Sequence, residues 1–62
     1  MYTYTVTLVN FGTEIYRGSD LATALGKAEK AGFETTVQID YDDEHHGKGR
    51  SYRNYSPIRG WH

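Results

Sequence analysis

The sequence contains no cysteine, only one proline and no long apolar run. Without cysteine there is no disulfide, no thiolate metal ligand and no cysteine nucleophile. A cysteine-free chain fits a reducing compartment, so we expect a cytoplasmic protein. A membrane span needs about 18 consecutive apolar residues, so we expect no membrane contact. Residues 1–4 lack the basic and apolar segments of a secretory signal.

Apolar residues are also scarce, at 37% of a chain of 62 residues. A chain of this length buries only about 60% of its unfolded surface and forms one small core. We therefore expect a single domain over residues 1–62. Because such a core gives little stability, a homo-oligomer stays open as a further way to bury apolar surface.

Acidic and basic residues are separated along the chain. Residues 1–47 hold eight acidic and three basic side chains (−5), and residues 48–62 hold four basic and no acidic ones (+4), which gives the net charge of −1. The chain as a whole thus lacks the basic charge typical of nucleic-acid binders. A local positive charge remains at its C-terminal end.

Three segments alternate between two kinds of side chain, as strands do. Residues 2–9 direct two tyrosines, Val6 and Leu8 to one face, and three threonines and Val9 to the other. Residues 13–17 follow a turn at 10–12 and predict the second strand of a hairpin. Residues 33–40 have the clearest apolar face, so they predict a third strand.

A helix is predicted between the second and third strands, over about residues 20–31. Ser19 or Asp20 can cap its first N–H groups, and Gly32 fits the left-handed position after its end. Apolar residues recur at helical spacing and predict one buried stripe. That stripe consists of Leu21, Ala24, Leu25 and Ala28.

The remainder of the chain is polar and less regular. Residues 41–49 predict a loop or the distal part of a hairpin, and residues 50–55 predict a last strand. Pro57 ends that strand and residues 58–62 are interpreted as a tail. The sequence therefore predicts an α+β two-layer domain with the order ββαβ(β), in which one helix packs on a three- or four-stranded, mainly antiparallel sheet. Residues 1–40 form its core, and residues 41–62 a polar hairpin or loop followed by an aromatic and basic tail.

The middle of the chain, residues 14–39, carries a recognisable series of short motifs. They are Ile15-Tyr16, Asp20-Leu21, Ala24-Leu25, Ala28-Glu29, Ala31-Gly32-Phe33-Glu34 and Thr36. This series resembles the middle of the small phage-encoded inhibitor of bacterial RNA polymerase, which implies a compact phage protein that acts by binding. That family's contact arginines lie on the strand after Gly-Phe-Glu, where this chain has Val37, Gln38 and Ile39, so no site residue is transferred. The ββαββ order is also similar to that of the immunoglobulin-binding domains of streptococcal protein G.

Catalytic and metal-binding motifs are weak. His45 and His46 follow three acidic residues, but neighbouring side chains of an extended segment point to opposite faces and do not easily share one ion. No nucleophile motif accompanies Ser51 or Ser56. We therefore predict no enzyme activity, no metal site and no cofactor.

The C-terminal segment interleaves arginine with aromatic residues, which is typical of protein interfaces and also of single-strand nucleic-acid sites. A purely structural role in a terminal strand is the third interpretation. We expect a non-enzymatic binding protein that inhibits or modulates a host macromolecular machine, such as a polymerase, nuclease or defence complex, in the host cytoplasm if phage-encoded. Nucleic-acid binding is the alternative. The predicted partner-binding residues are Tyr52, Arg53, Tyr55 and Trp61 as anchors, and Asp42, Asp43 and Glu44 as charge complement.

Overall fold

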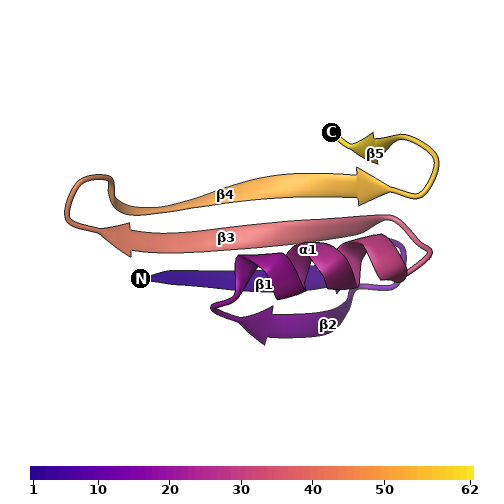
Figure 1. Cartoon of the computed structure of the whole chain (residues 1–62), viewed down its shortest axis with the longest axis horizontal. Coiled ribbons are helices and arrows are strands. Elements are labelled where there is room, and N and C mark those ends of the chain that lie inside the picture. Colours follow the sequence, from indigo (N-terminus) through magenta and orange to yellow (C-terminus); the bar gives the residue numbers. More distant parts are fainter.

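The computed structural model describes residues 1–62 and shows one helix packed on a five-stranded antiparallel sheet (Figure 1). In chain order the elements are β1 (Tyr2–Leu8), β2 (Thr13–Gly18), α1 (Leu21–Lys30), β3 (Thr35–Asp43), β4 (Gly47–Ser56) and β5 (Gly60–Trp61). The sheet order is β2-β1-β3-β4-β5. This confirms the predicted α+β class. The sheet has one strand more than expected, because residues interpreted as a tail form β5 on the outer side of β4.

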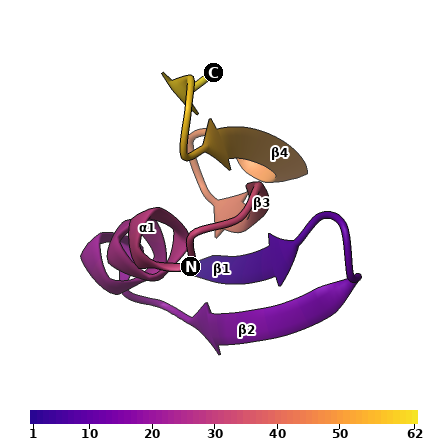
Figure 2. The ribbon, with the colours of Figure 1, turned by 90° about the vertical axis from the view of Figure 1, so that its right-hand side faces the viewer.

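The apolar face of the sheet follows from the alternation in β1 and β3. Directly opposed residues of antiparallel strands point to the same face, and Val6 opposes Val37 while Tyr4 opposes Ile39. Val6 and Val37 are fully buried beneath the helix. Figure 2 shows the helix on one side of the sheet only, so the other face stays open.

The helix begins and ends where its capping residues predict. The Asp20 carboxylate accepts a hydrogen bond from the backbone N–H of Thr23, at 3.2 Å, and Gly32 follows the helix with a φ of +78°. This helix lacks the length and apolar character that crossing a membrane requires.

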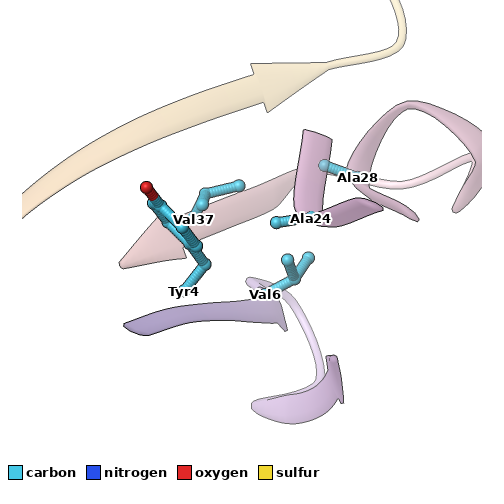
Figure 3. Packing of buried hydrophobic residues seen from close by; sticks show 5 residues of the cluster. All are labelled: Tyr4, Val6, Ala24, Ala28 and Val37. Carbon is cyan, nitrogen blue, oxygen red and sulfur yellow. The ribbon is translucent and has the colours of Figure 1, made fainter. Parts of the chain in front are cut away.

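The predicted apolar stripe is only half correct. Ala24 and Ala28 are fully buried, whereas Leu21 is 36% exposed and Leu25 is only partly buried. The small residues lie at the centre of the contact, where they allow the helix backbone to approach the sheet closely. Figure 3 shows Ala24 and Ala28 gathered with Val6 and Val37.

The acidic and glycine-rich segment after Asp40 is a hairpin, the second of the two alternatives for residues 41–49. β3 continues to Asp43, and β4 begins directly after the turn, at Gly47. The pairing runs without a register shift from Asp43–Gly47 to Thr35–Tyr55. As a result the hairpin projects well beyond one end of the helix (Figure 1).

Candidate functional site

The helix covers only part of the apolar sheet face because it is much shorter than the strands. Ten helical residues span about 15 Å at 1.5 Å per residue, whereas nine strand residues span about 30 Å. The uncovered end forms a groove of about 430 Å³. We call it the tyrosine groove; it is lined by Tyr2, Tyr4, Leu21, Ile39, Tyr41, His46, Ser51 and Arg53.

Strand register brings the tyrosines of the groove together. Tyr2 of β1 opposes Tyr41 of β3, and their ring centroids lie 6.2 Å apart. Tyr2 also stacks on Tyr4 at 6.3 Å. The groove therefore has a floor of aromatic and aliphatic side chains, which is the lining typical of binding sites.

Gly49 makes room for one of these rings. It opposes Tyr41 in the hairpin, and a Cβ atom at Gly49 would overlap the end of the Tyr41 side chain. The Tyr41 ring thus crosses β4 because this position has no side chain. Gly47 has a different role, since its φ of +72° lies in the left-handed region that glycine adopts without strain. The Gly47-Lys48-Gly49 motif therefore combines a turn position with a seat for an aromatic ring.

Polar groups lie at the rim of the groove. The Arg53 guanidinium lies 5.7 Å from the centre of the Trp61 ring and forms no salt bridge. His46 contacts the Asp43 carboxylate through Nδ1 at 3.2 Å. Desolvation, and next the negative charge of Asp43, raise the pKa of the Tyr2 hydroxyl. The groove thus offers tyrosine side chains beside one cation without a carboxylate partner.

The predicted anchors Arg53, Tyr55 and Trp61 lie together on the helix side of the sheet. Tyr55 and Trp61 are partly buried against the core, with ring centroids 5.0 Å apart. The indole N–H of Trp61 donates to Glu29 of the helix at 3.1 Å. These two aromatic residues therefore hold β5 against the domain, and Arg53 is the only predicted anchor that lines the groove.

The other predicted partner-binding residues are scattered. Tyr52 opposes Gln38 and points to the open face of the sheet, where it is 57% exposed. Asp42 opposes Lys48 on that same face, whereas Asp43 accepts the His45 backbone N–H within the turn. Glu44 is exposed in the turn. No three histidine or carboxylate side chains come close enough to hold a metal ion.

Sequence reasoning missed the tyrosines of the groove. The sequence predicts Tyr2 and Tyr4 as part of a strand, where aromatic residues commonly pack in the core, and Tyr41 as the start of a loop or hairpin over residues 41–49. The available signal was that tyrosine, with its polar hydroxyl, recurs at the ends of β1 and β3 that oppose each other. The extent of the groove could not be predicted without the register and length of the hairpin.

Two aspartates of the hairpin should make stability depend on acid pH. Hydrogen bonds from Arg50 and then Gln38 lower the pKa of Asp40, and those from the His45 backbone and then His46 lower the pKa of Asp43. A carboxyl group with a lowered pKa in the folded state stabilises the fold above its unfolded pKa of about 3.9. This stabilisation is lost as the pH falls through the folded pKa.

We therefore expect the urea midpoint of unfolding to fall steadily below about pH 4, the range set by the unfolded aspartate pKa. The Asp40→Asn/Asp43→Asn variant should show a flatter fall than wild type. The matched control is Asp42→Asn, because the Asp42 side chain accepts no hydrogen bond. If the urea midpoint of Asp42→Asn falls as little with pH as that of the double variant, the effect comes from overall charge and not from these hydrogen bonds.

Comparison of the chain with protein-family models, with curated protein sequences and with solved structures found no match.

Proposed function

We propose that this chain is a small non-enzymatic binding protein that recognises a partner protein through the tyrosine groove. The observation that carries the proposal is an uncovered aromatic surface beside the unpaired cation Arg53. Tyrosine and arginine are enriched among the residues that dominate protein interfaces. In a domain with so few buried residues, an aromatic surface left in water adds little stability. We therefore expect that a partner covers this surface.

The arrangement of polar groups supports binding rather than catalysis. The groove volume falls within the range of about 300–1,000 Å³ found for small-molecule sites. However, the Ser51 hydroxyl makes no hydrogen bond to His46 or to any carboxylate. Nucleophile and base are not assembled, and acid–base catalysis requires two titratable groups held in a defined geometry.

Nucleic-acid binding is the second candidate, and it would use the open face of the sheet. Tyr52 is exposed there next to Arg50, with Lys48 further along the same face, and a tyrosine beside a cation can stack on a base. The same face also carries Asp40 and Asp42, and Asp40 pairs with Arg50 at 2.7 Å. These carboxylates would repel phosphates, so we rank a protein partner first. We propose further that the chain acts in the cytoplasm and that its partner is a host macromolecular machine.

A selection from random twelve-residue peptides displayed on phage tests the proposal. Peptides enriched by the immobilised chain should bind Tyr41→Ala at least tenfold more weakly, since truncation of a central aromatic anchor commonly costs about 2 kcal/mol or more. Phe11→Ala is the matched control, because Phe11 is an exposed aromatic residue that does not line the groove. Circular dichroism verifies that both variants are folded.

Two outcomes would reject the proposal. In the first, the selected peptides bind wild type and Tyr41→Ala equally. In the second, no peptide is enriched, but labelled single-stranded oligonucleotides bind at about 150 mM salt, where only contact-range attraction survives. If Tyr52→Ala then loses oligonucleotide binding, the binding site lies on the open face of the sheet.

A further inference from the structure

The outer edge of β4 is largely unpaired. β5 pairs only with Tyr55 and Ser56, and His62 adds two backbone hydrogen bonds to Asn54. β5 is the one strand outside β4 in the sheet order, and it does not reach residues 47–53. These residues therefore have no strand on their outer side. This segment borders the tyrosine groove, which Ser51 and Arg53 line.

The direction of the free backbone groups follows from the pairing. The N–H and C=O groups of Asn54 point outward, because both bond to His62. In an antiparallel ladder these groups alternate from side to side along a strand, and β4 pairs with β3 without a register shift. The N–H and C=O groups of Tyr52, Arg50 and Lys48 therefore also point outward, with no partner.

We propose that this edge binds an extended segment of the partner protein as a sixth strand, in which acidic and apolar residues alternate. The inference deepens the proposed function and rests on it, because one face of the added strand would border the tyrosine groove. Addition of a strand to a free sheet edge is a recurrent mode of peptide recognition. Main-chain hydrogen bonds supply affinity, and alternate side chains supply specificity.

The alternation is set by the faces of β4. Side chains opposite Lys48, Arg50 and Tyr52 would lie on the open face, since opposed residues share a face. On this face β4 carries Lys48 and Arg50 and no acidic residue. Arg50 is already paired with Asp40, whereas Lys48 forms no salt bridge, so a carboxylate of the partner would find a free cation at Lys48. Side chains opposite Gly49 and Ser51 would instead lie on the helix side, next to the aromatic lining of the groove.

Other occupants and another edge fit less well. A second copy of this chain would bring its own β4, which supplies no carboxylate to Lys48 or Arg50 in any register. Basic residues on an edge strand oppose pairing between identical copies. The free edge of β2 is shorter, and its ladder with β1 is interrupted between Val6 and Thr7. Bulges of this kind disrupt further pairing.

The probe is a capped synthetic octapeptide of alternating glutamate and valine, with a lysine–valine octapeptide as control. Amide hydrogen exchange of the full chain, followed by NMR, should slow on addition of the acidic peptide at the amides of Lys48, Arg50 and Tyr52. Two N-methylated versions of the peptide, modified at alternate positions, should differ at least tenfold in affinity. Only one of the two sets of amides faces β4. The Lys48→Glu variant should reverse the preference toward the lysine peptide.

Each alternative has its own result. Equal binding of both N-methylated peptides overturns strand addition. So does the absence of binding of the acidic peptide at 1 mM, since a dissociation constant of that size corresponds to a binding free energy of only about −4 kcal/mol. Slow exchange at Lys48, Arg50 and Tyr52 without peptide, together with a dimer in sedimentation, assigns the edge to a second copy and also overturns it. The proposed function has a separate test: it is wrong if peptides selected on the chain bind Tyr41→Ala as tightly as wild type. If they depend on Tyr41 but leave the edge amides unprotected, the groove stands and the added strand is wrong.

Discussion

Replacement of Trp61 by alanine should lower the free energy of unfolding by about 3 kcal/mol, at the low end of values for truncating large buried aromatic residues. The side chain packs on Tyr55 at a centroid distance of 5.0 Å, bonds to Glu29 and lies beneath Arg53. It is the main contact that holds β5 and the end of β4 to the helix. In a domain whose core supplies only about 3–5 kcal/mol, this loss would leave about 2 kcal/mol or less.

Urea unfolding followed by far-UV circular dichroism measures this effect, because tryptophan fluorescence disappears with the residue. Ile58→Ala is the matched control, since Ile58 lies in the same C-terminal segment but is 95% exposed. Its effect should stay within about 0.5 kcal/mol. Trp61→Phe keeps an aromatic ring and loses the hydrogen bond to Glu29, so it should fall between the two. A Trp61→Ala variant as stable as Ile58→Ala would mean that the tail does not pack on the helix.

Enlargement of the small helix residues that face the sheet should lower stability almost as much. Ala28 is fully buried between α1 and the sheet, in the same cluster as Val6 and Val37. Ala28→Leu adds three carbon atoms where the helix backbone lies close to the strands, and such overpacking typically costs about 1–3 kcal/mol. We expect a loss of about 3 kcal/mol, because the helix has to move away from the whole core.

Ala22→Leu is the matched control for this prediction. Ala22 is exposed on the same helix, so the identical change there adds a side chain to solvent and should alter stability by less than about 0.5 kcal/mol. Both variants are measured by thermal and urea unfolding. Equal losses at Ala22 and Ala28 would show that leucine is disfavoured throughout this helix and not that the contact is close.

The groove and the β4 edge relate to the C-terminal segment in different ways. Arg53 contributes its side chain to the groove, whereas Tyr52 contributes outward backbone groups and an exposed ring on the opposite face. Adjacent residues of one strand thus serve two surfaces. Under the proposed function, a partner that adds a strand would contact both surfaces.

The sequence by itself determined the local elements. The alternation in β1 and β3 set which residues share a face, because side chains of a strand alternate whatever the partner. Asp20 and Gly32 set the ends of the helix, because capping depends only on the neighbouring backbone. The α+β class followed from these elements, since an apolar helix face and an apolar sheet face must cover each other.

Only the tertiary structure decided which elements meet and what they leave uncovered. β5 consists of two residues, too few for any periodicity, and it exists because Trp61 packs on Tyr55 and Glu29. Leu25 and Ala28 belong to one stripe in the sequence, yet the packing of the helix on the sheet buries the alanine fully and the leucine only partly. The tyrosine groove arises from the hairpin extending beyond the helix, and that length depends on long-range strand pairing that no local pattern encodes.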